Sequence, residues 1–177
     1  MMKATQNPLR RISSRAIIVL CLGLIISAGA PARAASWSGI EPLRSRRADV
    51  ERALGAPVNE QPDNAGALVF RVAGGTVTVS FADARFVQSR NLGADAVGTV
   101  LQIVLQHESA NETPESLNLI GNRAFQREQR NNIVAFTNER DGIVYLFIDN
   151  RLRTTRYTPT LAQLSRGGRG RGFRTIF

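Results

Sequence analysis

Residues 68–81 read LVFRVAGGTVTVSF, and this stretch decides the class of fold. Large apolar residues recur at every second position on both sides of Gly74 and Gly75, which is the period of a β-strand with one buried face. Two adjacent glycines between such runs are typical of the tight turn in a β-hairpin. The sequence therefore predicts two antiparallel strands joined at the glycines.

Four more segments have the pattern of strands, at residues 99–107, 133–137, 142–148 and 151–157. Segment 142–148 is apolar at both odd and even positions, as expected for a strand that is covered on both faces. We therefore place it centrally in the sheet. Together with the hairpin, these segments predict an antiparallel sheet of about five or six strands.

Residues 43–57, LRSRRADVERALGAP, carry the start and stop signals of a short helix. The hydroxyl of Ser45 can cap the first turn, and Gly55 suits the left-handed residue that follows a helix. Val50 and Leu54 lie four residues apart and form one narrow apolar stripe. Because so short a helix is unstable alone, its stripe is expected to dock on the sheet.

A second helix is predicted to begin at Thr113, with Pro114 in the first turn, and to end at Gly121. In each half of the chain, a capped helix would then precede a run of antiparallel strands. The expected architecture is one α+β domain over residues 35–160, with two short helices on one face of the sheet. The order of elements suggests two tandem helix-plus-strands units.

The first 34 residues have the layout of a cleavable signal peptide. A positive segment with Lys3, Arg10, Arg11 and Arg15 precedes a 15-residue apolar core at 16–30 and a small-x-small site at 32–34. The core is shorter than the roughly 20 residues of a spanning helix, which makes a membrane anchor the secondary interpretation. We therefore expect export by the secretory pathway to the periplasm or the extracellular medium.

Removal of this leader changes the composition of the chain. Cys21, the only cysteine, lies in the leader, so the remaining domain has no thiol for a disulfide, a nucleophile or a metal site. Five of the 23 Lys and Arg residues also lie there, without any acidic residue, which leaves a net charge of +4. A domain so close to neutral gives no indication of nucleic-acid binding.

Residues 161–177 are rich in Arg and Gly, a composition that predicts disorder. Basic residues on a flexible tail can contact an anionic surface such as a membrane or lipopolysaccharide. The candidate residues for this contact are Arg166, Arg169, Arg171 and Arg174.

The sequence contains no recognisable catalytic motif. His107 is the only histidine, and no serine lies in a G-x-S-x-G pattern that would support a nucleophile. One histidine and no cysteine outside the leader leave the usual zinc sites without ligands, and no cofactor is expected. The remaining enzymatic alternative is an envelope hydrolase with a site around Glu139, Asp141 and His107.

The pattern L-x-S-x-R-x-D-V-E-x-x-L-G-x-P, at residues 43–57, resembles the helix-to-strand segment of BamE/SmpA-type periplasmic proteins. The β-lactamase inhibitory protein is built from a similar small unit in tandem. Together with FTNERDGIVYLFIDNRLRTTRYTPT at 136–160, the segment looks like a family of uncharacterised exported bacterial proteins. The resemblance implies a scaffold for protein–protein contact and no catalytic residues. BamE-type proteins carry an acylated cysteine at the end of the leader, which Cys21 in mid-core does not match.

These observations predict an exported, non-enzymatic protein that binds another protein of the cell envelope. A surface-associated protein held by its basic tail is a further alternative. Exposed residues that are candidates for partner contact are Trp37, Arg44, Arg46, Arg47, Arg52, Arg71, Arg85 and Phe86. For Trp37 the competing interpretation is that the side chain covers an edge of the sheet.

Overall fold

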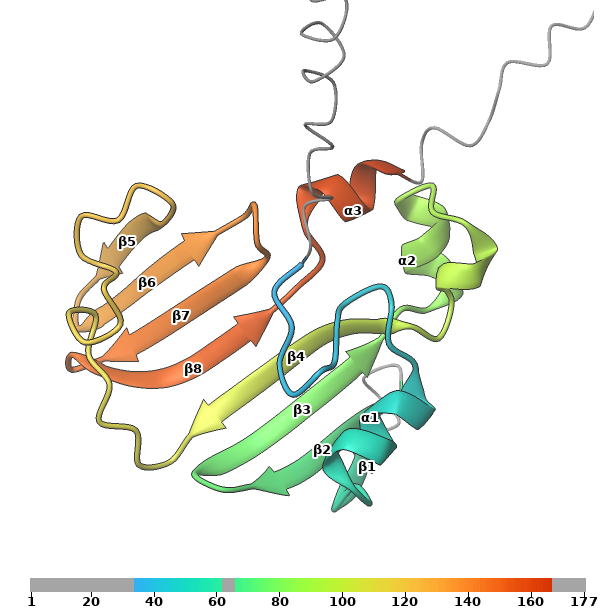
Figure 1. Cartoon of the computed structure of the whole chain (residues 1–177), viewed down its shortest axis with the longest axis horizontal. Helices are drawn as coiled ribbons and strands as arrows, with labels where there is room; N and C mark the ends of the chain where they lie inside the picture. The colour runs from blue at the N-terminus through green and yellow to red at the C-terminus, as the bar shows by residue number, and fades with distance from the viewer. Residues whose placement is uncertain (1–33, 62–65, 167–177) are drawn as a thin grey trace, which may run out of the picture. The chain divides into compact units, whose positions relative to one another are not determined.

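The computed structural model describes residues 34–61 and 66–166 (Figure 1). The predicted signal peptide, apart from Ala34, lies outside these residues, as does the tail beyond Arg166. No helix in the described part of the chain is both long and apolar enough to cross a membrane.

Eight strands form one antiparallel sheet in the described residues. They are β1 (Asn59–Gln61), β2 (Ala67–Val72), β3 (Gly75–Phe81), β4 (Val100–His107), β5 (Gln126–Arg130), β6 (Ile133–Asn138), β7 (Ile143–Ile148) and β8 (Arg151–Tyr157). Their order across the sheet is β1-β2-β3-β4-β8-β7-β6-β5. The predicted α+β class and antiparallel sheet are confirmed, and the number of strands exceeds the expected five or six.

All six predicted strands are present, and two strands were not predicted. Strand β1 has only three residues, and strand β5, at the other edge, is exposed along its whole length. The sequence of β5 is QREQR, which contains no apolar residue and so gives no alternating signal. Short or charged edge strands are common because they discourage pairing with other chains.

The sheet consists of two four-stranded meanders, β1–β4 and β5–β8. The last strand of each meander lies at the centre, where β4 pairs with β8 and Leu105 is opposite Thr155. Strand β7 lies between β6 and β8, in agreement with its apolar residues on both faces. The two meanders agree with the expectation of two related halves, but no helix precedes the strands of the second half in the described residues, so the suggested tandem helix-plus-strands units are not present.

The first predicted helix is α1 (Arg47–Leu54). Its Val50 is fully buried against the sheet and Leu54 packs beside it, as the apolar stripe predicts. The capping residue is Arg46 rather than Ser45, because Asp49 Oδ2 accepts a hydrogen bond from the Arg46 backbone N–H at 2.9 Å. Ser45 lies one residue earlier and is buried, where its Oγ accepts from the Glu41 N–H.

The second predicted helix, over residues 113–121, is wrong. Thr113 Oγ1 does accept from the Ser116 N–H, but the chain then continues as a series of turns. Asn118 adopts a positive φ of 52°, which ends any helix, and Leu119 is directed into the core. Burial of one large apolar side chain therefore overrides the helix-start signal of the local sequence.

Two further helices lie outside the two predicted ones. Helix α2 (Ala84–Ser89) is capped by Asp83, and a 3₁₀ turn at Ala94–Ala96 follows it. Helix α3 (Leu161–Arg166) takes up the first six residues of the segment expected to be disordered. Thr160 caps α3 through its Oγ1, which accepts from the Gln163 N–H at 3.1 Å.

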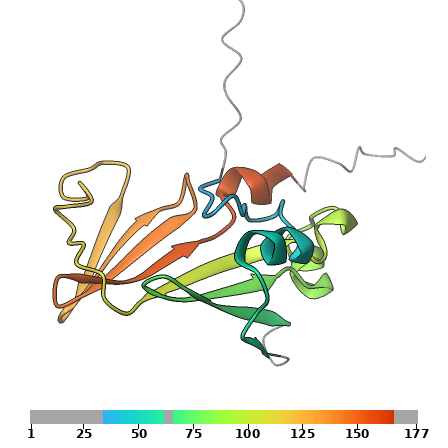
Figure 2. The ribbon, with the colours of Figure 1, turned by 60° about the horizontal axis from the view of Figure 1, so that its bottom comes forward.

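The two faces of the sheet differ in their covering. Helix α1, helix α3, the segment 34–46 and the loop 110–125 all lie on one side, which we call the covered face (Figure 2). Two apolar clusters fill it. The first cluster is Ile40, Val50, Leu68, Phe70, Val77, Val79, Val100, Ile103 and Leu105, and the second is Leu119, Phe136, Phe147 and Leu152. We call the opposite side the open face.

Candidate functional site

The open face consists of paired residues that point away from both apolar clusters, since directly opposed residues share a face. Its two central rows are Val69, Thr78, Val104, Arg156, Val144, Thr137 and Arg71, Thr76, Gln106, Thr154, Leu146, Ala135. All of these side chains are half-buried or exposed, whereas their neighbours on the covered face are mostly buried. No described segment covers the open face.

Positive charge lies at the middle of this face. Arg156, on the central strand β8, is exposed and has no ion pair or hydrogen bond with any described residue. Arg153 is also exposed, at a β-bulge in the same strand. Strands β3, β4, β6, β7 and β8 contain no Asp or Glu, so nothing on the inner strands neutralises these guanidinium groups.

Aliphatic side chains lie beside the arginines, on strands β6 and β7. Val144, Leu146 and Ile148 on β7 adjoin Ile133 on β6, whose side chain is 40% exposed. An aliphatic strip next to unpaired arginines resembles the composition of protein–protein interfaces, in which Arg is enriched and other charged residues are depleted.

Three of the predicted contact arginines near α1 form ion pairs within their own segment. Arg44 pairs with Glu41 at 3.4 Å, Arg47 with Glu51 at 2.9 Å, and Arg52 with Asp49 at 3.0 Å. The hydrogen bond from the Arg46 backbone and the Arg52 guanidinium lower the pKa of Asp49. The arginine of each pair is exposed to solvent, and such surface pairs add little stability.

Arg46 ties α1 to the segment before β4. Its Nη2 donates to the Asp95 carbonyl at 2.8 Å and its Nη1 donates to the Val97 carbonyl at 3.3 Å. The arginines in and before α1 therefore all have structural contacts, a result that spacing alone predicts only for Arg47.

The other predicted contact residues are scattered. Arg71, on the open face, forms an ion pair with Glu108. Arg85 is exposed on α2, and Phe86 beside it is half-buried, with the Arg90 guanidinium 6.0 Å from the centre of its ring. Arg166 ends α3, and the other arginines of the predicted anionic-surface site lie outside the described residues.

The structure does not bring together the three residues of the hydrolase alternative. Asp141 holds the β6–β7 turn, where its Oδ2 accepts from Asn138 Nδ2 at 2.8 Å. Along the strand direction, His107 lies six residues from Asp141 by register, on the order of 20 Å at about 3.3 Å per residue. No group of three or more metal-ligating side chains occurs in the described residues either.

His107 has a different set of neighbours. Its Nε2 lies 2.9 Å from Thr155 Oγ1, across the β4–β8 pair. Burial lowers the pKa of the imidazole below its ordinary value, and the negative charge of Glu112 opposes that effect. His107 is therefore predominantly neutral at pH 7.

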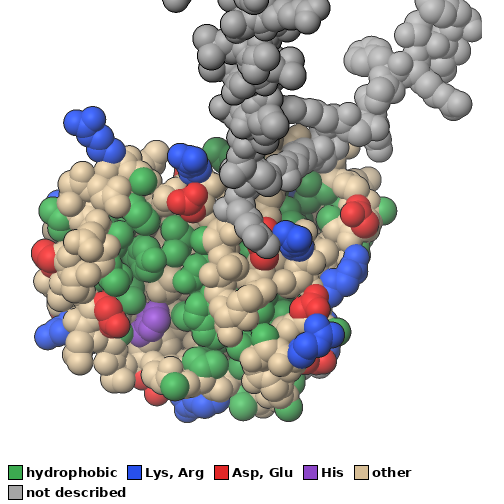
Figure 3. Space-filling model, viewed as in Figure 1, with side chains coloured by type: hydrophobic (Ala, Val, Ile, Leu, Met, Phe, Trp, Pro, Cys, Tyr) green, Lys and Arg blue, Asp and Glu red, His purple; other side chains and the backbone are tan. Residues whose placement is uncertain are grey.

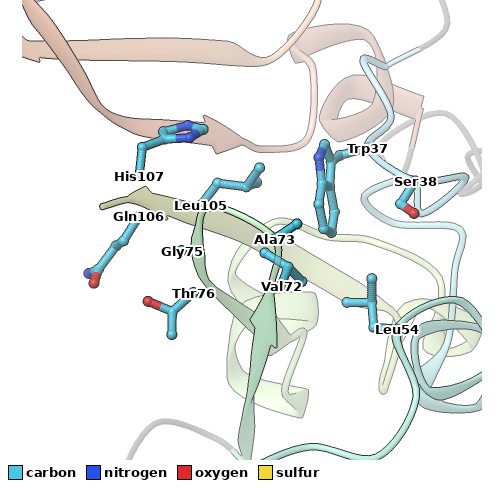
Figure 4. A pocket seen from close by; sticks show the side chains of 11 residues that line it. Trp37, Ser38, Leu54, Val72, Ala73, Gly75, Thr76, Leu105, Gln106 and His107 are labelled. Carbon is cyan, nitrogen blue, oxygen red and sulfur yellow. The ribbon is translucent and has the colours of Figure 1, made fainter. Parts of the chain in front are cut away.

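Trp37 and His107 lie on opposite sides of an open cavity of about 420 Å³ on the covered face (Figure 4). Leu105 and Val72 line its floor, and Leu54 of α1 lies beyond the indole. Trp37 also packs against the first apolar cluster. Both sequence interpretations of Trp37 are thus incomplete, because the side chain forms the wall of a cavity.

Hydrophobic side chains continue beyond this cavity over β7 and β8, with the histidine at the border of the patch (Figure 3). Tyr157 packs beside the first cluster and Tyr145 beside the second, and each is half-buried. Phe125 follows, with its ring centre 5.9 Å from that of Tyr145. We call this row of Trp37, Tyr157, Tyr145 and Phe125 the aromatic row.

Comparisons with known proteins assign no family to the chain. No family model and no curated protein matches it. Among solved structures, it is similar to a DUF4309 family protein (YjgB) from Bacillus subtilis, with 16% identity, 69% of this chain and 83% of that chain covered, and a TM-score of 0.45. The resemblance to BamE-type proteins stays a prediction.

Proposed function

We propose that this chain is an exported, non-enzymatic protein that binds another protein of the cell envelope through its open face. The observation that carries the proposal is a wide antiparallel sheet with one uncovered face, on which unpaired arginines lie beside aliphatic side chains. The partner that fits this face presents acidic side chains opposite β8 and an apolar patch opposite β7.

The size of the open face supports this role. Eight strands at about 4.8 Å spacing, with about six residues each at about 3.3 Å per residue, give an area of roughly 750 Å². A standard protein–protein interface buries about 800 Å² on each partner, so the face and its flanking turns suffice for one such contact. Strand residues also hold their side chains in fixed positions, which lowers the entropy lost on binding.

Site-specific photo-crosslinking tests the proposal. A photoreactive residue at Thr78 or Val144, both on the open face, should trap one defined envelope protein. The same residue at Val97, which is 39% exposed in the segment between the 3₁₀ turn and β4, is the control. Excess unlabelled protein should compete for the crosslink, and Arg156→Glu protein should compete at least tenfold less well, since one lost buried charge pair is worth more than about 1.4 kcal/mol.

Arg85→Glu makes the same change of charge at a predicted contact residue on α2. It therefore tests whether α2, rather than the open face, is the binding surface. We expect it to compete as well as the unaltered protein. Equal crosslinking from Val97 and Val144, or loss of competition by Arg85→Glu alone, would place the contact elsewhere and reject the open face as the binding surface.

A further inference from the structure

We propose that the aromatic row and the cavity beside Trp37 form a binding site for a neutral oligosaccharide, with one sugar ring stacked on the indole of Trp37. The aromatic side chains of this site lie on the covered face, away from the protein contact proposed for the open face, and Thr76 and Gln106 of the open face also line the cavity. Four features carry the inference: a rigidly held tryptophan, further aromatic rings on the same face, polar groups without partners, and a lining without charge.

Trp37 is held in place by a tight turn of the backbone. Trp37 and Ile40 exchange two backbone hydrogen bonds, of 3.1 and 2.9 Å. The two residues between them, Ser38 and Gly39, both have positive φ, of 52° and 79°. A left-handed serine is strained, and strained backbone clusters where a side chain must be held for binding. The turn fixes the indole as one wall of the cavity (Figure 4).

The aromatic row gives an extended ligand more than one ring to contact. Tyr145 is opposite Thr155, so Tyr157 is its diagonal neighbour on the next strand, about 7–8 Å away. Trp37 and Tyr157 both pack against the first cluster, and Phe125 lies beside Tyr145. Aromatic side chains from distant segments of the sequence thus lie over the two clusters of the covered face, which suits a chain of several sugar rings.

The polar atoms of these side chains have no partners among the described residues. The indole N–H of Trp37 and the hydroxyls of Tyr145 and Tyr157 make no hydrogen bond there. Burial and the neighbouring Tyr145 raise the pKa of Tyr157 to about 12, so its hydroxyl keeps its proton at neutral pH. A purely apolar ligand would remove water from these donors without replacing its hydrogen bonds, at a cost of about 1–3 kcal/mol for each group.

The cavity has no charged lining residue, because His107 is predominantly neutral at pH 7. An anionic ligand would find no counter-charge in the lining and would lose its hydration, and the charge that acts on His107 is the negative charge of Glu112. A neutral sugar needs no counter-charge and can also replace the hydrogen bonds of the lost water. Its C–H faces stack on aromatic rings, and its hydroxyls bond to the indole N–H and the tyrosine hydroxyls. Pockets of this kind combine an apolar wall with a few fixed polar groups.

Trp37 is the only tryptophan of the chain, so its fluorescence reports directly on the cavity. The purified full-length protein is titrated with maltotriose, cellotriose and triacetylchitotriose, each up to about 10 mM, which saturates a site with a Kd of about 1 mM to roughly 90%. We expect a saturable change in emission with at least one sugar, and saturation-transfer NMR signals from the same sugar.

Two variants locate the site. Tyr157→Phe keeps the ring and removes one hydroxyl, and it should weaken binding about fivefold, as for one lost hydrogen bond. Thr78→Val, on the open face, should leave binding unchanged. The inference is overturned if none of the three sugars binds, if p-cresol binds and the sugars do not, or if the two variants bind equally well. None of these results depends on the crosslinking partner of the open face.

Discussion

Gly142 and Gly121 differ in how closely another segment of the backbone approaches them. Gly142 and Gly121 have nearly the same φ, of 69° and 71°. A Cβ on Gly142 would lie 2.1 Å from the Thr158 carbonyl oxygen, whereas a Cβ on Gly121 would meet nothing within 4 Å. The pair therefore separates the effect of backbone strain from that of a steric clash.

Gly121→Ala should lower the free energy of unfolding by about 1 kcal/mol, the cost of a left-handed alanine. Gly142→Ala should lower it by at least about 2 kcal/mol more, because the backbone of Thr158 must also move. Urea unfolding of both variants measures the difference. Equal losses would show that the approach of Gly142 to Thr158 does not constrain the native state.

The pKa of His107 gives a second prediction about a single residue, through the dependence of stability on pH. Burial lowers its pKa in the folded state below the ordinary value of 6.5. The folded protein therefore binds fewer protons than the unfolded chain near that pH, and stability is lost as the pH falls below about 6.5. The single imidazole can be followed by proton NMR, and its pKa should lie below 6.5.

Glu112→Gln should lower the pKa of His107 further, because it removes the negative charge that favours the protonated ring. His107→Asn should flatten the dependence of stability on pH between about 6.5 and 5. An imidazole that titrates at or above 6.5, or an unchanged pKa in Glu112→Gln, would contradict this environment.

Single residues of the candidate sites can be singled out from the sequence, but their positions relative to one another cannot. The sequence marks Trp37 and His107 as the only residues of their kind, but nothing local indicates that they line one cavity. That proximity depends on the pairing of β3 with β4 and on the turn at residues 37–40. Whether Arg156 is exposed depends likewise on which face of β8 is covered. The alternation of side chains along the strand does not determine that face.

At the scale of elements, helix α3 joins the end of the domain to its beginning. Gln163 Nε2 donates to the Pro42 carbonyl at 2.8 Å, and its Oε1 accepts from the Thr160 N–H at 2.9 Å. Thr160 itself is fully buried. One glutamine therefore completes the cap of α3 and also anchors the helix to the segment before α1.

Gln163→Ala should lower the free energy of unfolding by about 1–2 kcal/mol and should speed amide hydrogen exchange in α3. Ser165→Ala changes an exposed residue of the same helix and should have an effect within about 0.5 kcal/mol. Identical exchange rates in the two variants would show that the bond to Pro42 does not hold α3 in place.

Strands and helices can be predicted where apolar residues recur at the spacing typical of that element. The six strands with alternating or continuous apolar residues, and helix α1 with Val50 and Leu54, follow from the sequence. Strand β5 does not, because it buries no side chain and is defined only by backbone pairing with β6. The turns at 113–121 were predicted as a helix because the cap signal is local, whereas the burial of Leu119 depends on the second cluster.

At the scale of the whole sheet, the two meanders share a seam between β4 and β8. The first apolar cluster contains Leu105 of β4, and Tyr157 of β8 packs against the same cluster. Strand pairing and side-chain packing thus both cross the seam. We expect the two meanders to unfold as one cooperative unit.

Leu105→Ala should lower the free energy of unfolding by about 2–5 kcal/mol, as for a buried leucine. Emission of Trp37 reports on the first meander, and NMR signals of Phe136 and Phe147 report on the second. All three probes should show the same midpoint in urea, in the unaltered protein and in the variant. Separate midpoints would mean that the meanders are independent domains.

The order of the strands also has a consequence for synthesis of the chain. Strand β8 ends 50 residues after β4, so at about 5–20 residues per second a ribosome produces β4 roughly 3–10 s before its partner. During that interval the nascent first meander exposes a long, mostly apolar strand edge at the position that later becomes the centre of the sheet. A growing chain with such an edge is a substrate for holding chaperones, and slower translation through residues 108–150 would lengthen that period of risk.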